Sequence, residues 1–91
     1  MIQPTVGRVV WFWNPAVPGP HAAIVTFVHS NTVVNLAVFD HSGEVLGQSS
    51  VHLVQPGNER PEGPYCEWMP YQVKKATGSE SGEKDVGEQV I

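Results

Sequence analysis

Four histidines and one cysteine are the side chains of this sequence whose chemistry could support catalysis or metal binding. The histidines are His21, His29, His41 and His52. Structural zinc sites commonly use ligand pairs about two to five residues apart. The closest histidines here are eight residues apart. We therefore interpret all four as solvated surface residues and expect neither a metal nor a cofactor.

Cys66 is the one candidate nucleophile with a neighbouring carboxylate, Glu67. A reactive thiolate needs an electropositive, partly exposed setting. Cys66 instead alternates with Trp68 along a short apolar segment, which predicts a small buried side chain. The glycines punctuate turns and match no phosphate-binding pattern. The sequence therefore predicts a protein that is not an enzyme.

The aromatic side chains are the most informative set for function. They are Trp11, Phe12, Trp13, Phe27, Phe39, Tyr65, Trp68 and Tyr71. We expect Phe27 and Trp68 to lie in the core. Tryptophan and tyrosine are over-represented at binding hot spots. The candidate protein-contact residues are therefore Trp11, Trp13, Tyr65, Tyr71 and Phe39. The alternative is that these rings pack beneath two proline-rich loops, Asn14–Pro20 and Pro56–Pro64.

The segment Ala22–Asp40 predicts the central β-hairpin that positions these side chains. Both halves are rich in β-branched and apolar residues, and Ser30-Asn31 between them favours a turn. A two-residue loop at Ser30-Asn31 and a four-residue loop give the same register, which pairs Phe27 with Val34, Val25 with Leu36 and Ala23 with Val38. These six side chains share one face, which we expect to be the core. A one-residue slip would place Phe27 against Asn35.

The opposite face of the hairpin is also apolar, which is more than one small core needs. It carries Ile24, Val28, Val33 and Phe39. An exposed apolar surface of this kind predicts contact with a partner protein or self-association.

The remaining segments predict an all-β fold. We expect strands at Val6–Trp13, at Glu44–Gln48 as a short edge, at Ser49–Gln55 and at Tyr65–Tyr71. The inward set of the first strand is either Val10 with Phe12, which we favour, or Val9 with Trp11 and Trp13. Asp40–Gly43 has the residue preferences of a type I turn. Short strands, proline-rich loops and no helical period predict a five-stranded, SH3-like barrel over residues 1–75.

The charge of the 91-residue chain is concentrated at its C-terminal end. Residues 1–75 hold four basic and five acidic side chains, whereas residues 76–91 hold one basic and four acidic side chains. We expect residues 76–91 to be a disordered acidic tail. The near-neutral remainder lacks the basic stripe that usually binds phosphates, so nucleic acid is a disfavoured partner. No apolar run approaches the ~20 residues that span a bilayer, so we expect no membrane segment.

Three blocks, VNLAVFD, SVHLVQP and YCEWMPYQ, together with PTVGRVVWF, resemble a group of small, functionally uncharacterised proteins of tailed bacteriophages and prophages. The resemblance covers Pro4 to Gln72, and YCEWMPYQ is its most specific part. It implies a phage or prophage origin and a location in the bacterial host cytoplasm or on the virion. It brings no activity and no site residues.

These observations favour a small binding or assembly module that acts through protein–protein contacts. One alternative is a barrel that binds single-stranded nucleic acid by stacking aromatic rings on bases. Another is a host-directed inhibitor, for which the acidic tail is the indication.

Overall fold

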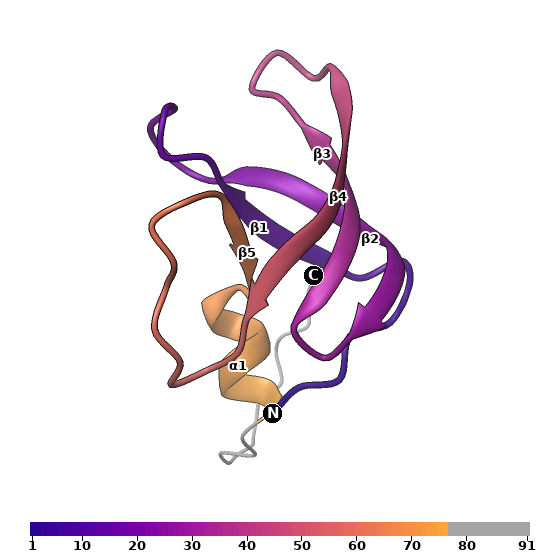
Figure 1. Ribbon diagram of the computed structural model, residues 1–91, viewed down its shortest axis with the longest axis vertical. Coiled ribbons are helices and arrows are strands. Elements are labelled where there is room, and N and C mark those ends of the chain that lie inside the picture. Colours follow the sequence, from indigo (N-terminus) through magenta and orange to yellow (C-terminus); the bar gives the residue numbers. More distant parts are fainter. Residues whose placement is uncertain (77–91) are drawn as a thin grey trace.

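The strands follow one another around a closed barrel (Figure 1). The elements are β1 (Val9–Trp13), β2 (His21–Ser30), β3 (Val33–Phe39), β4 (Val45–Val54), β5 (Tyr65–Glu67) and α1 (Pro70–Ala76). Neighbouring strands are antiparallel except for β4 and β5, and β5 returns to pair with β1. The predicted all-β, SH3-like barrel is confirmed. The computed structural model describes residues 1–76, so the tail expected at 76–91 lies outside the described residues apart from Ala76.

The core is built from the inward side chains of all five strands. Its members are Val10, Phe12, Ala23, Val25, Val34, Leu36, Val38, Val51, Leu53, Cys66 and Trp68. The predicted inward positions of Val10 and Phe12 are confirmed, as is the burial of Trp68. The prediction for Phe27 is wrong, because 52% of this side chain is exposed.

A β-bulge explains the exposure of Phe27. The predicted pairs of Ala23 with Val38 and Val25 with Leu36 are confirmed, but the register shifts after Val25. Phe27 then lies opposite Asn35, and Val28 lies opposite Val34. An extra residue in one strand reverses the alternation of its side chains. Val28 therefore packs against the core in place of Phe27.

The turn between β2 and β3 lies one residue later than expected. Ser30 pairs with Val33, so the two-residue loop is Asn31-Thr32 and not Ser30-Asn31. A second register shift, between Val28 and Ser30, causes the difference. The turn between β3 and β4 follows the prediction, since the N–H of Gly43 donates to the carbonyl of Asp40 at 2.7 Å.

β4 is one long strand, and the expected edge segment and fourth strand are its two halves. The strand bends where Ser50 adopts a positive φ of 54°. The Asn35 side chain of β3 supports the bend: its Oδ1 accepts the N–H of Ser50 at 2.8 Å. The bend lets the second half of β4 turn inward, where Val51 and Leu53 enter the core.

The expected fifth strand, Tyr65–Tyr71, ends at Glu67, and α1 replaces its second half. Pro70 suits the first position of a helix because its missing N–H has no intrahelical role there. The Gln72 side chain accepts the N–H of Met69 at 2.7 Å and donates to the carbonyl of Val9 at 2.8 Å. The contact with Met69 resembles half of a capping box. No helix of the described part is long and apolar enough to cross a membrane.

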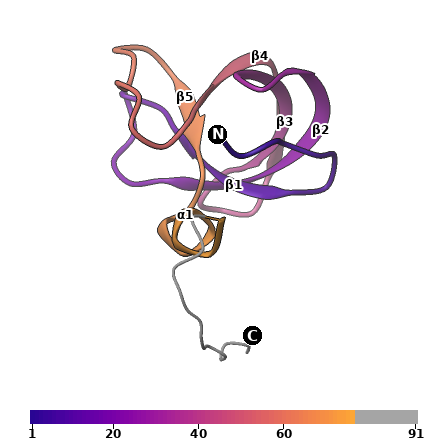
Figure 2. The same cartoon turned by 90° about the horizontal axis from the view of Figure 1, so that it is seen from below.

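The N-terminal segment is paired but is not part of the first strand. β1 begins at Val9 and not at Val6, because Gly7 turns the chain with φ 96°. The N–H of Gly7 donates to the carbonyl of Val25, and the N–H of Val25 donates to that of Arg8. Figure 2 shows this segment across one end of the barrel, with α1 outside the ring of strands.

Candidate protein-contact site

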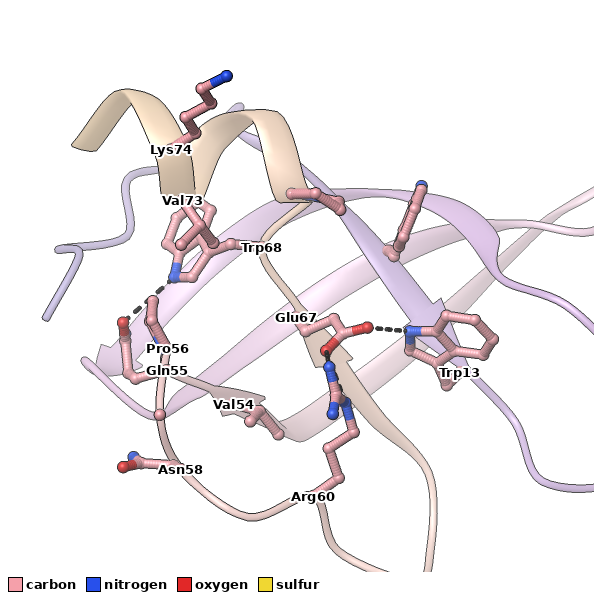
Figure 3. A pocket seen from close by; sticks show the side chains of 13 residues that line it. Trp13, Val54, Gln55, Pro56, Asn58, Arg60, Glu67, Trp68, Val73 and Lys74 are labelled. Carbon is pink, nitrogen blue, oxygen red and sulfur yellow. Dashed lines mark hydrogen bonds and ion pairs between the residues drawn. The ribbon is translucent and has the colours of Figure 1, made fainter. Parts of the chain in front are cut away.

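A groove of ≈ 790 Å³ lies where β1, β5, α1 and the loop after β4 meet (Figure 3). We call it the tryptophan groove. Its principal lining residues are Trp11, Trp13, Pro56, Arg60, Glu67 and Trp68. Two are tryptophans of the predicted contact set, and Pro56 and Arg60 belong to a predicted proline-rich loop.

The pairing of β1 with β5 assembles the aromatic wall. Trp13 lies opposite Tyr65 and Trp11 opposite Glu67, while Phe12 and Cys66 between them face inward. The Trp13 and Tyr65 rings stack with centroids 6.5 Å apart, and Trp11 meets Trp13 edge-on at 6.0 Å. Both tryptophans are half-buried. Residues 56–58 and Arg60 of the proline-rich loop line the groove beside these rings.

Glu67 holds the wall in place, as the close view shows (Figure 3). Its Oε2 accepts the indole N–H of Trp13 at 2.7 Å. Its Oε1 accepts from Arg60, with Nε at 2.9 Å and Nη2 at 2.8 Å. The Glu67 side chain is only 12% exposed, so its charge is compensated by these donors and less by water.

The electrostatics of this cluster follow from the same contacts. The hydrogen bond that Arg60 donates to Glu67 raises the pKa of the Arg60 guanidinium, which is charged in any case. Burial raises the pKa of the Tyr65 hydroxyl, and the negative charge of Glu67 adds to that shift. Tyr65 therefore remains a neutral ring beside Trp13 at physiological pH.

Trp68 is the buried end of the groove. Its indole N–H donates to Gln55 Oε1 at 3.3 Å, and the Arg8 guanidinium lies 5.7 Å from its ring centroid. Gln55 is itself buried and fully bonded: Oε1 also accepts the N–H of Ile2, and Nε2 donates to the carbonyls of Ile2 and Asn31. One glutamine thus links Trp68, the N-terminal segment and the tip of the β2–β3 hairpin.

The structure brings together three of the five predicted contact residues. Trp11, Trp13 and Tyr65 form the aromatic wall described above. Tyr71 lies on α1 and lines a separate groove of ≈ 730 Å³. Phe39 ends β3 opposite Val45 and is half-buried, away from both grooves.

Glu67, Arg60 and Gln55 are site residues that the sequence prediction did not identify. Strand alternation places Glu67 on the same face as Tyr65. Its contact with Trp13 depends on the register between β1 and β5, which lie far apart in sequence. The same alternation places Glu67 and Cys66 on opposite faces of β5, so these two neighbours do not form a reactive pair.

The histidine prediction is wrong for His21, which is buried. Its Nδ1 has no hydrogen-bond partner among residues 1–76, and its ring stacks on His41 with centroids 4.3 Å apart. His29, His41 and His52 are exposed, as expected. Within residues 1–76, no three His, Cys, Asp or Glu side chains are grouped so that they could hold a metal ion.

The prediction that Cys66 is buried is confirmed, and burial raises the pKa of its thiol to about 12. Cys66 therefore stays protonated at physiological pH.

Comparisons of the chain with protein-family models, with curated proteins and with solved structures found no match.

Proposed function

We propose that this chain is a small binding or assembly module that acts through protein–protein contacts, with the tryptophan groove as its contact surface. The observation that carries the proposal is the gathering of Trp11, Trp13 and Trp68 at one groove, where Trp11 and Trp13 are partly exposed. Indole rings bury a large area with few rotatable bonds, which is why they dominate binding hot spots. The proposed occupant is an extended apolar segment of a partner protein.

Two features of the groove support this occupant. Glu67 and Tyr65 already hold Trp13 in position, so a partner pays little entropy to order that ring. Glu67 is the one carboxylate among the residues that line the groove, and Trp13 and Arg60 already use its oxygens. A basic segment would therefore have to displace Arg60 from Glu67, which favours an apolar segment that packs on the half-buried rings of Trp11 and Trp13.

The protein in this proposal binds and does not catalyse. The buried, protonated Cys66 supports this choice, because a thiol with a pKa of about 12 is a poor nucleophile.

The proposal includes a bacteriophage or prophage origin, with action in the host cytoplasm or on the virion. Its support is the resemblance carried by VNLAVFD, SVHLVQP and YCEWMPYQ. The neighbouring genes test it directly. Virion genes on either side would favour assembly, early genes would favour action on the host, and a non-phage neighbourhood would contradict the origin.

Selection from a displayed library of random peptides tests the groove. We expect an apolar consensus, and we expect Trp13→Ala to weaken the selected peptide about 10-fold or more, as the loss of a hot-spot side chain does. Fluorescence titration measures the affinity. Phe27→Ala is the matched control, because Phe27 is an exposed aromatic residue on β2, outside the groove. Circular dichroism checks that each variant is folded.

Equal peptide affinity of Trp13→Ala and the unmodified chain would contradict the groove as the contact surface. Titration with a single-stranded oligonucleotide at low and high salt tests the alternative partner. Binding that salt abolishes and Trp13→Ala weakens would replace the protein-contact proposal with nucleic-acid binding.

A further inference from the structure

The first half of β4 is a sheet edge that is paired on one side only. Residues 45–48 pair with β3, from Phe39 opposite Val45 to Leu36 opposite Gln48. β5 pairs with β4 only at Leu53 and Val54. Figure 1 shows this half of β4 rising with β3 beyond the rest of the barrel. In the described part of the chain, no strand pairs with its outer side.

The backbone groups on the outer side can be assigned from the alternation of an antiparallel ladder. The N–H of Asp40 donates to the carbonyl of Glu44 at 2.8 Å, so Glu44 points its backbone toward β3. Because the direction of the backbone groups alternates along a strand, those of Leu46 and Gln48 also point toward β3. Val45 and Gly47 therefore direct one N–H and one C=O each away from the sheet.

This edge lacks the charged residues and prolines with which soluble proteins often protect exposed edges, although β4 bends just beyond it at Ser50. Natural edges usually carry a proline, a lysine or an inward charge. Residues 45–52 read VLGQSSVH, with no proline, lysine, arginine or acidic residue. Val45 is 54% and Leu46 48% exposed. The segment thus offers unpaired backbone groups beside apolar side chains.

We propose that two copies of the chain pair through this edge, antiparallel, about a two-fold axis at Leu46. In this register Val45 of each copy lies opposite Gly47 of the other, and the outward backbone groups form four hydrogen bonds. Leu46 meets its own copy in the closely spaced, non-hydrogen-bonded position. The contact is isologous, so it closes as a dimer and does not propagate.

Charge and shape favour a second copy as the occupant. Residues 45–48 carry no charge, so the pairing of Val45 with Gly47 brings no like charges together. Glu44 falls opposite Gln48 and not opposite its own copy. Gly47 has open space where a Cβ would stand, which leaves room for Val45 of the other copy. Because the paired segment is short, the dimer is weak and depends on concentration.

Sedimentation equilibrium of the full chain, over a concentration series, tests the proposal. We expect a reversible monomer–dimer equilibrium. Gly47→Pro removes an outward N–H without touching the ladder to β3, and we expect it to shift the dissociation constant at least about 10-fold upward. Gly63→Pro is the matched control, at a loop glycine that also has open space. Circular dichroism confirms folding.

A disulfide trap tests the register independently. Facing residues of a non-hydrogen-bonded pair are about 4.5 Å apart at Cα, within the range of disulfides. We expect Leu46→Cys to form a covalent dimer under mild oxidation at least about 10-fold faster than Val6→Cys, an exposed control far from the edge. The native Cys66 is buried and does not compete.

Several results would overturn the proposal. These are a strict monomer at about 1 mM, a dimer that Gly47→Pro leaves intact, and equal oxidation rates for the two cysteine variants. A dimer lost in Trp13→Ala but kept in Gly47→Pro would assign self-association to the tryptophan groove. Peptide binding to the groove and edge pairing use different elements, so either can fail while the other holds.

Discussion

At the scale of single residues, Gln55 shows how one buried side chain can organise a small barrel. Its amide oxygen accepts two N–H groups and its amide nitrogen donates to two carbonyls, so its four bonds use its full capacity. The partners come from the N-terminal segment, the Asn31 turn and Trp68. No hydrophobic side chain of similar size could satisfy these groups.

We predict that Gln55→Leu lowers the free energy of unfolding by about 2–4 kcal/mol, because it leaves several polar groups without a partner. Urea denaturation measures the change. Gln48→Leu is the control, since Gln48 is exposed on β4, and we expect it to stay within about 0.5 kcal/mol of the unmodified chain. Equal stability of the two variants would show that the Gln55 bonds contribute little.

Cys66 predicts a stability change at high pH. Burial raises the pKa of this thiol from 9.0 to about 12. The unfolded state therefore loses the proton first, so stability is intact below pH 9 and falls between pH 9 and about 12. The slope approaches about 1.4 kcal/mol per pH unit. We expect urea denaturation of Cys66→Val to lack the slope between pH 9 and 10, where Tyr65, whose pKa is also raised, does not yet contribute. An unchanged slope in that interval would exclude the thiol as its cause.

At the scale of elements, the bulge in β2 decides which aromatic residue leaves the core. Strict alternation would place Val25 and Phe27 on the inner face. Val25 and Val28 face inward instead, because the bulge leaves both Thr26 and Phe27 on the outer face. The consequence is that an aromatic residue predicted to be buried becomes surface.

The bulge predicts opposite tolerances at adjacent positions. We expect Phe27→Thr to change the free energy of unfolding by no more than about 0.5 kcal/mol, and Val28→Thr to lower it by about 1–2 kcal/mol. Thermal and urea denaturation of the two variants measure the difference. The reverse order would show that β2 continues its alternation through Thr26 in solution.

Much of the barrel could be predicted from the sequence, because period-2 alternation and turn chemistry act locally. Val10 and Phe12 inward, the pairs from Ala23 to Val25 and the Asp40–Gly43 turn all follow from such patterns. The bulges do not, since an inserted residue leaves no compositional mark. A helix of seven residues is too short to show a period, although Pro70 followed by Gln72 is a recognisable start signal.

The candidate site was predictable only in part, for the same reason. Trp11, Trp13 and Tyr65 were predicted as contact residues from the enrichment of tryptophan and tyrosine at binding hot spots. The position of Glu67 between Trp13 and Arg60 depends on a strand pairing across more than fifty residues and on a loop conformation. Neither follows from local sequence.

At the scale of the whole molecule, the strand pairings that close the barrel differ in length. The β2–β3–β4 sheet is made of long strands that follow one another directly. β1 and β5 join the two ends of the described chain through three residue pairs, and β4 meets β5 through only two. Cys66 takes part in both of these short pairings.

The pairing of β1 with β5 has a consequence for how fast the chain folds. Contacts between distant segments must overcome a large loop-closure entropy, so we expect refolding on the millisecond-to-second timescale. We further expect the β2–β3–β4 sheet to form in the transition state, and the pairing of β1 with β5 to form after it. Stopped-flow tryptophan fluorescence should therefore show that Cys66→Ala mainly accelerates unfolding, whereas Leu36→Ala slows refolding. If Cys66→Ala slowed refolding and Leu36→Ala mainly accelerated unfolding, the pairing of β1 with β5 would nucleate folding. During synthesis, the barrel can close only after the segment following Pro64 has left the ribosome. Until that moment the inner face of the β2–β3–β4 sheet is accessible to chaperones.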